Sequence, residues 1–288
     1  MRPGSRKDCV LNVFEFTFLV GLGSALAGFL GSLTGLGGGV VIVPLLVLLF
    51  HVNIHYAMGA SLVSVIATSS GAAAAYVKEG YSNIRVGMFL EIATTFGAIF
   101  GAFMVAEVST PAIGIIFGVV LLGSAYLSMQ PRKPGTLAHE SGPVAKLLKM
   151  DGSFPTPAGP REYHVRRVPL GFGLMFVAGA LSGLLGIGSG AFKVLAMDQA
   201  MSIPFKVSTT TSNFMIGVTA AASAGIYLRR GYVEPGLAMP VMLGVLAGSL
   251  VGVRVLVTAE TVWLRRVFGL VIVALALEMM YGALTGKL

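Results

Sequence analysis

The chain has 288 residues, of which 55% are hydrophobic and 11% are charged, and its formal net charge is +8. A soluble globular protein has about 25% charged residues, so most side chains here must face lipid or one another, which excludes a soluble domain. The basic surplus lies mostly in a linker and at loop ends. There it anchors and orients a membrane protein, so it calls for no nucleic-acid partner.

Apolar segments follow one another along both halves of the chain. In the first half they are Val10–Leu33, Val40–Phe50, Ala57–Val77, Val86–Ala106 and Pro111–Met129. In the second half they are Val168–Leu185, Ala191–Ile203, Val207–Leu228, Leu237–Val257 and Val262–Leu284. A full crossing needs roughly 20 residues, so Val40–Phe50 and Ala191–Ile203 are too short and read as half-helices or re-entrant pieces. We predict an all-α integral membrane protein with about four transmembrane helices and one short segment in each half.

The two halves share one pattern at an offset of 151 residues. The shared register begins where Ala27 recurs as Ala178 and continues to Phe117, which recurs as Phe268. Apolar composition alone does not explain the matching glycine spacing. We therefore predict two tandem homologous repeats, residues 10–129 and 168–288, joined by a basic linker at residues 130–167.

The linker is polar and rich in Pro, Gly, Lys and Arg, and we expect a mobile segment without a core of its own. Lys/Arg-rich short loops stay in the cytoplasm, so we place the linker and the basic N-terminus inside. The loop with Lys78 and Arg85 and the loop with Arg229 and Arg230 also read as cytoplasmic. Four crossings plus one re-entrant segment in each copy satisfy these assignments. If the short segments cross fully, the copies are inverted and the linker lies outside, which we rank second.

A glycine-rich stretch stands where a long apolar segment meets a short one, once in each half. The two stretches are Thr-Gly-Leu-Gly-Gly-Gly at 34–39 and Leu-Gly-Ile-Gly-Ser-Gly at 185–190. Glycine at this density favours an irregular backbone, whose N–H groups and following helix dipole can bind an anion. Tight helix packing through small residues is the alternative. The binding residues predicted here are Thr34, Gly35, Gly37, Gly38, Gly39, Gly186, Gly188, Ser189 and Gly190.

Polar residues open the membrane helix that follows the second glycine stretch. They run from Thr209 to Asn213, and Ser61 stands at the matching place in the first half. Five polar residues exceed what one helix cap requires. We therefore add to the predicted site Ser61, Thr210, Thr211, Ser212 and Asn213.

Lys193 lies three residues beyond the second glycine stretch, and its counterpart in the first half is Ile42. An ionisable residue in a membrane segment indicates a functional site, and a lysine here could neutralise an oxyanion. Snorkelling of the side chain toward the interface is the alternative. Glu15, Glu91 and Glu278 also lie in or near apolar segments. One of them could carry a coupling proton, and the sequence does not distinguish them.

Small residues spaced four apart predict helix contact faces at Gly97/Gly101, Gly114/Gly118 and Gly244/Gly248/Gly252, either within the chain or between subunits. The sequence has no nucleophile elbow, metalloprotease motif or P-loop. We expect no enzyme activity, no cofactor and no metal.

The glycine motifs carry a family resemblance. The paired stretches at 27–39 and 178–190, the Thr211-Ser212 pair and the mid-copy Gly-Tyr pairs resemble those of the TauE/SafE family of sulfite exporters and anion permeases. The resemblance covers nearly the whole chain outside the linker. Ala60 replaces a threonine frequent in the family, and Ser189 stands where Gly38 provides a glycine in the first copy.

The resemblance implies a multi-pass protein of the bacterial inner membrane that moves sulfite, organosulfonates or related sulfur-containing oxyanions, mostly outward. We expect a secondary transporter that works by alternating access around a midplane site at the paired glycine stretches. A membrane-embedded enzyme and a scaffold subunit without transport are the alternatives. Proton coupling and a homo-oligomer stay open.

Overall fold

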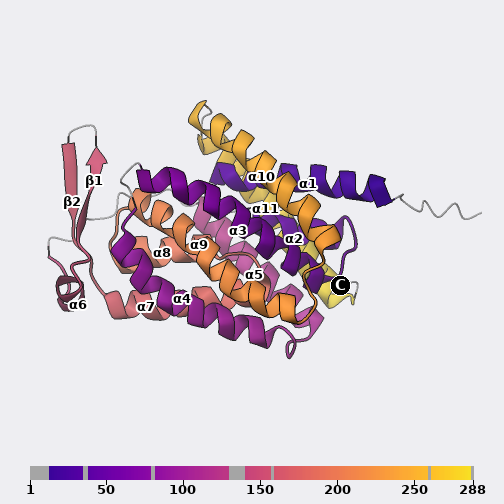
Figure 1. Cartoon of the computed structure of the whole chain (residues 1–288), viewed down its shortest axis with the longest axis horizontal. Coiled ribbons are helices and arrows are strands. Elements are labelled where there is room, and N and C mark those ends of the chain that lie inside the picture. The colour runs from indigo at the N-terminus through magenta and orange to yellow at the C-terminus, as the bar shows by residue number, and fades with distance from the viewer. Residues whose placement is uncertain are drawn as a thin grey trace, which may run out of the picture.

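The computed structural model describes residues 13–34, 38–78, 82–129, 140–156, 159–258 and 261–286. The first half contains α1 (Val13–Thr34), α2 (Gly39–Leu48), α3 (Ile54–Lys78), α4 (Ile84–Met104) and α5 (Thr110–Met129). The linker contains α6 (Pro143–Leu147), β1 (Gly152–Thr156) and β2 (Gly159–Tyr163). The second half contains α7 (Val168–Leu185), α8 (Gly190–Leu195), the π-helical turn η1 (Ala196–Ala200), α9 (Phe205–Arg229), α10 (Pro235–Thr258) and α11 (Thr261–Leu284). Both halves place one short helix after their first long helix (Figure 1), as the apolar segments predict.

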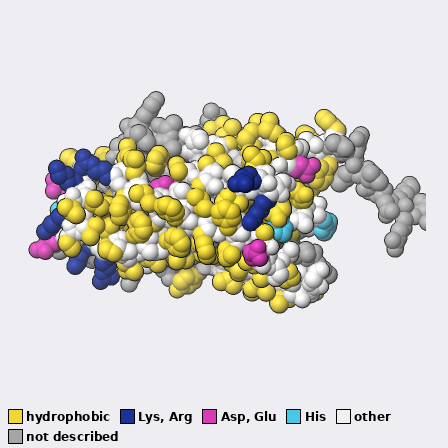
Figure 2. Space-filling view, turned by 60° about the horizontal axis from the view of Figure 1, so that its bottom comes forward, with side chains coloured by type: hydrophobic (Ala, Val, Ile, Leu, Met, Phe, Trp, Pro, Cys, Tyr) yellow, Lys and Arg dark blue, Asp and Glu magenta, His cyan; other side chains and the backbone are white. Residues whose placement is uncertain are grey.

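The outer face of the bundle is apolar. Within the described residues, four helices are long and apolar enough to cross a membrane, with apolar windows at Phe14–Gly31, Ile84–Met104, Val168–Leu185 and Pro235–Gly252. Large hydrophobic side chains such as Phe96 stay more than half exposed on these helices, which in a soluble protein would be an aggregation hazard. Figure 2 shows hydrophobic side chains over the middle of one face, with Lys and Arg gathered mainly at the end that carries the linker. The prediction of an all-α integral membrane protein is confirmed.

Glycine lets the long helices approach one another closely. A methyl group added to Gly97 of α4 would lie 2.1 Å from the carbonyl oxygen of Phe176 in α7. A methyl group on Gly101 would lie 2.0 Å from the carbonyl oxygen of Ala180. Such contacts leave no room for a side chain, and they replace the hydrophobic driving force that lipid does not provide.

The same kind of contact joins α1 to α10 and α5 to α11. A methyl group on Gly248 would lie 1.9 Å from the Ala25 carbonyl oxygen. One on Gly118 would lie 2.2 Å from the Met280 side chain of α11 and 3.1 Å from the Ala276 carbonyl oxygen. These predicted contact faces are therefore used inside the chain. Helix α1 packs against α10, and α7, which corresponds to α1 in the second half, packs against α4. Two homologous copies would make this reciprocal contact, although the repeat itself is inferred from the sequence.

The loops before α4 and before α10 lie at opposite ends of the bundle. Asn83, just before α4, donates from Nδ2 to the Met150 carbonyl oxygen in the linker, at 2.8 Å. Arg230, just before α10, donates to the carbonyl oxygens of Ala102 and Phe103 at the other end of α4, each at 3.0 Å. Because α4 has 21 residues, about 30 Å separates its two ends. The prediction that both loops face the cytoplasm is therefore wrong.

The start of α1 lies at the Arg230 end, far from the linker. The ring of Phe16 contacts that of Phe50, with centroids 5.9 Å apart. Phe50 lies shortly before His55, whose ring is 4.9 Å from that of Tyr232. The first half therefore starts at the end where the second half finishes, and the two halves run in opposite directions. This contradicts the expectation that the first repeat begins on the same side as the linker; the basic N-terminal residues Arg2, Arg6 and Lys7 lie outside the described residues. That expectation rested on counting basic residues, whereas α1 and α2 together enter and leave the bundle at the same end.

The described part of the linker, residues 140–156 and 159–167, is folded. β1 and β2 pair antiparallel, with Gly152 opposite Tyr163. Ala145, Met150 and Val165 are buried in a cluster that continues into α4 and η1. The expectation of a mobile segment without a core is therefore wrong here. A short segment can order itself by burying a few apolar side chains against a neighbour, which composition does not reveal.

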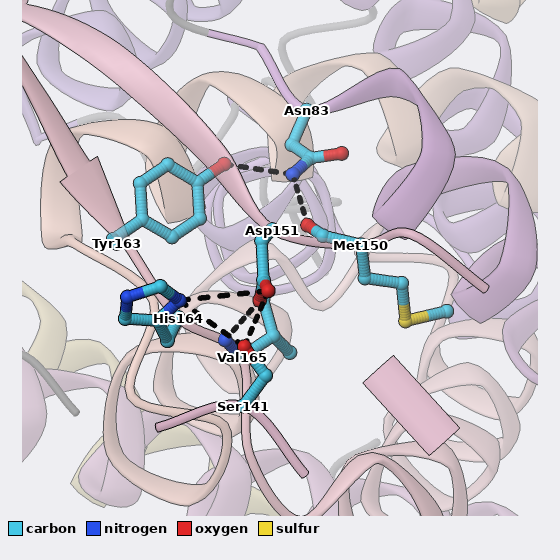
Figure 3. A network of polar contacts seen from close by, with 7 residues as sticks. All are labelled: Asn83, Ser141, Met150, Asp151, Tyr163, His164 and Val165. Atoms are coloured by element: carbon cyan, nitrogen blue, oxygen red, sulfur yellow. Dashed lines mark hydrogen bonds and ion pairs between the residues drawn. The ribbon is translucent and has the colours of Figure 1, made fainter. Parts of the chain in front are cut away.

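Polar contacts close this linker fold (Figure 3). Asp151 accepts from the backbone N–H of Val165 at 2.9 Å and from the Ser141 hydroxyl, and His164 Nδ1 lies 3.5 Å from its Oδ2. Asn83 also donates to the Tyr163 hydroxyl at 2.7 Å, which ties the hairpin to the start of α4.

The linker fold should loosen in acid. Burial acts to raise the pKa of Asp151, but the hydrogen bonds from Ser141, Val165 and His164 outweigh it and lower the pKa below its ordinary 3.8. The stabilisation by the carboxylate is then present above pH 3.8 and is lost as the pH falls through the lowered pKa. We expect hydrogen exchange at the Val165 N–H, corrected for its intrinsic rate, to accelerate over that range. Asp151→Asn should show the faster exchange already at neutral pH, and an unchanged rate in this variant would contradict the prediction.

Candidate functional site

The second glycine stretch is an irregular break between α7 and α8. Gly186, Gly188 and Ser189 have φ angles of +67°, +73° and +42°. This left-handed region suits glycine and is strained for Ser189. The Gly186 N–H closes α7 by donating to the Ser182 carbonyl oxygen at 2.8 Å. The prediction of an irregular backbone holds for this stretch.

The first stretch is described only in part. Gly35 and Gly37 lie outside the described residues, and Thr34 is the last residue of α1. Gly38 precedes α2 in a helical conformation, and its carbonyl oxygen accepts from the N–H groups of Val41 and Ile42.

The start of α2 meets the second break inside the bundle. Ser61 of α3 donates to the Gly186 carbonyl oxygen at 2.8 Å, and its hydroxyl lies 3.5 Å from that of Gly39. A methyl group on Gly39 would lie 3.3 Å from the Ile187 carbonyl oxygen. Ser212 of α9 donates to the Gly190 carbonyl oxygen at 3.3 Å, which matches the Ser61–Gly39 contact at the repeat offset. The predicted residues Gly39, Ser61, Gly186, Gly190 and Ser212 are thus brought together.

The other polar residues of α9 do not join them. Because α9 begins at Phe205, these residues lie in the second and third helical turns and do not cap the helix. The Thr211 hydroxyl accepts from the Asn83 N–H at 3.1 Å, and that of Thr210 donates to the Lys206 carbonyl oxygen at 3.0 Å. Asn213 is partly exposed. Successive residues of a helix point in different directions, so five adjacent polar residues cannot all face one site.

Lys193 is fully buried, which excludes snorkelling. Its Nζ donates to the hydroxyl of Thr219 in α9 at 2.5 Å, and that hydroxyl lies 2.7 Å from Oε1 of Glu91 in α4. The Glu91 side chain is itself buried, and Thr95 donates to the same Oε1 at 3.3 Å. A hydroxyl group therefore links a buried ammonium to a buried carboxylate.

Two buried acceptors near Lys193 are left open. Oε2 of Glu91 and the hydroxyl of Ser189 have no hydrogen-bond partner among the described residues. Ser189 precedes Lys193 by one helical turn, since the Lys193 N–H donates to its carbonyl oxygen at 3.2 Å. An unpartnered buried polar atom is costly, and a ligand placed there would remove that cost.

The structure distinguishes the three glutamates. Glu15 and Glu278 are exposed on α1 and α11, whereas Glu91 is 8% exposed. Thr219 was not predicted at all. The repeat could have indicated this pair, because the counterparts of Lys193 and Glu91 in the other half are the apolar residues Ile42 and Met242. No cluster of three metal-ligating side chains occurs within the described part of the chain.

The family is decided by a comparison with known sequence families. The model described as sulfite exporter TauE/SafE matches residues 20–279. The chain belongs to the TauE/SafE family. No solved structure matches it significantly.

Curated relatives of this TauE/SafE protein are named as transporters. Probable membrane transporter protein YunE of Bacillus subtilis is 27% identical over 93% of this chain and 98% of its own length. YdhB of the same organism is 27% identical over 82% of this chain and 86% of its own. A relative from Methanocaldococcus jannaschii is 23% identical over 84% of this chain and 88% of its own. This TauE/SafE protein is a multi-pass membrane transporter.

Proposed function

We propose that this transporter carries a small sulfur-containing oxyanion, sulfite or an organosulfonate, across the bacterial inner membrane. The observation that supports this most is the buried ammonium of Lys193 one helical turn from the unpartnered Ser189 hydroxyl. A buried cation favours an anionic ligand, since the low dielectric of the interior strengthens their attraction. The name of the family supplies the chemical class of the anion.

The backbone at the two breaks adds hydrogen-bond donors. The first N–H groups of α2 and α8 have no acceptor within their own helices, and the dipole of α2 adds positive potential at Gly39. The Ser61 and Ser212 hydroxyls hold carbonyl oxygens of the breaks in place. The breaks therefore favour an oxyanion bound by backbone N–H groups, the Ser189 hydroxyl and Lys193.

The opposite directions of the two halves support alternating access. Transporters built from inverted repeats place substrate between broken helices and expose the site to each side in turn by rocking one half. The end of the bundle that carries the linker is the more basic one, so it is proposed to face the cytoplasm. The start of α1 would then face outward. The basic groups at the linker end, among the described residues, are Arg85, Lys146, Lys149, Arg161, Arg166, Arg167 and Lys206.

The test is thermal unfolding of the purified protein with sulfite, sulfate, thiosulfate, sulfoacetate, 2-hydroxyethanesulfonate, phosphate or lactate. A ligand at about 100 times its Kd stabilises the native state by about 2.7 kcal/mol. We expect stabilisation only by sulfite and the sulfonates. Ser189→Ala should weaken that binding by about 2- to 12-fold, since one hydrogen bond contributes about 0.5–1.5 kcal/mol.

Ser24→Ala is the matched control. Ser24 is also buried and has no hydrogen-bond partner within the described residues, but it lies in α1 beside Gly244 of α10, away from Lys193. Its variant should bind like the wild type. Stabilisation by none of the anions would contradict the proposed function.

A further inference from the structure

Glu91 and Lys193 form a neutral pair in the buried site. Thr219 lies between them and can accept from Lys193 while it donates its single proton to Glu91. Both charged side chains are buried. Burying an uncompensated charge costs far more than burying a pair. The site should therefore keep a net charge near zero in each conformation in which it is closed to water on both sides.

A bound anion disturbs this balance. If a monovalent anion joins Lys193 while Glu91 stays ionised, the buried site carries one negative charge. Protonation of Glu91 restores neutrality, and its unpartnered Oε2 is available to take up the proton. We propose that Glu91 is the proton-coupling group of this transporter, so that one proton from the solvent binds Glu91 whenever one monovalent sulfonate binds Lys193. This inference rests on the proposed function, since it assumes that an anion binds there.

Among the described residues, a single charged group faces Glu91. Its helix α4 packs against α7 and α9, and α7 contains no ionisable side chain. On α9 only Thr219 reaches Glu91. The other ionisable groups of the surrounding elements stand nearer the helix ends or on η1: Arg85, Asp198, Lys206, Tyr227 and Arg229. The protonation of Glu91 therefore responds to an anion bound at Lys193.

The pair is confined to one half of the pseudosymmetric bundle. In the repeat register, Ile42 corresponds to Lys193, Met242 to Glu91 and Thr68 to Thr219. Ile42 is fully buried, and the Thr68 hydroxyl donates to backbone carbonyl oxygens of its own helix. Packing alone can thus be satisfied without charges at these positions, so the fold does not require the ion pair.

The experiment measures proton uptake with binding of 2-hydroxyethanesulfonate, whose charge is constant between about pH 6 and pH 8 because sulfonic acids are strong acids. With one proton bound per anion, Kd should fall about tenfold for each unit that the pH is lowered. Adding the anion to weakly buffered protein should raise the pH by one proton equivalent. In Glu91→Gln, which keeps the oxygen that contacts Thr219, binding should remain, should not depend on pH and should take up no proton.

Glu278→Gln is the control, since Glu278 is an exposed glutamate of another membrane helix. It should keep the proton uptake of the wild type. Binding of 2-hydroxyethanesulfonate without proton uptake, or with uptake that persists in Glu91→Gln, would overturn this inference alone. The same holds if other anions of the panel stabilise the wild type but 2-hydroxyethanesulfonate does not. If none of them stabilises it, the proposed function fails as well.

Discussion

Lys193→Met is expected to abolish anion binding and to destabilise the protein. The variant removes the buried ammonium that faces Thr219. Truncating one partner of a buried charge pair costs about 2–5 kcal/mol of binding, which is at least about a 30-fold rise in Kd. Glu91 would then be left as a buried carboxylate without its cation, which costs about 3–5 kcal/mol of stability. Thermal unfolding with and without sulfite measures both effects.

The double variant Lys193→Met/Glu91→Gln separates folding from binding. Replacing both members of a buried ion pair is often neutral for stability, so the unfolding temperature should return to near the wild-type value while binding stays lost. Lys206→Met is the control, because Lys206 is exposed at the start of α9. Normal sulfite binding by Lys193→Met would contradict the assignment of Lys193 to the site.

Gly97→Ala/Gly101→Ala is expected to destabilise the bundle strongly. The added methyl groups would lie 2.1 Å and 2.0 Å from carbonyl oxygens of α7, so α4 and α7 would have to move apart. Overpacking typically costs about 1–3 kcal/mol at each position. The backbone itself must move, because the added methyl groups would contact backbone atoms of α7 and not flexible side chains. Thermal unfolding in detergent measures the loss.

Gly173→Ala in α7 is the control with the opposite sign. A methyl group at Gly173 meets nothing within 4 Å, and alanine is favoured over glycine in a helix by about 1 kcal/mol. It should leave stability unchanged or raise it slightly. Equal effects of the two changes would show that helix propensity, and not the contact of α4 with α7, decides the result.

The sequence determined which segments of this chain are helices. Local hydrophobicity and length decide whether a segment can cross a membrane, and both are readable from residues such as those of Val168–Leu185. The break at Gly186–Ser189 was also predictable, since dense glycine disfavours a helix. The family followed from the same motif.

The tertiary structure decided what depends on packing between distant segments. Counting basic residues put the linker and the start of α1 on one side. The contact of Asn83 with the linker and the ring contact of Phe16 with Phe50, near the Arg230 end, place them at opposite ends. The sequence offered three glutamates and one lysine without a partner. Only the packing of α9 against both α4 and α8 brings Glu91, 128 positions from Thr219, to that hydroxyl and so to Lys193. Such pairs lie far apart in the chain, and no local preference encodes which of them meet.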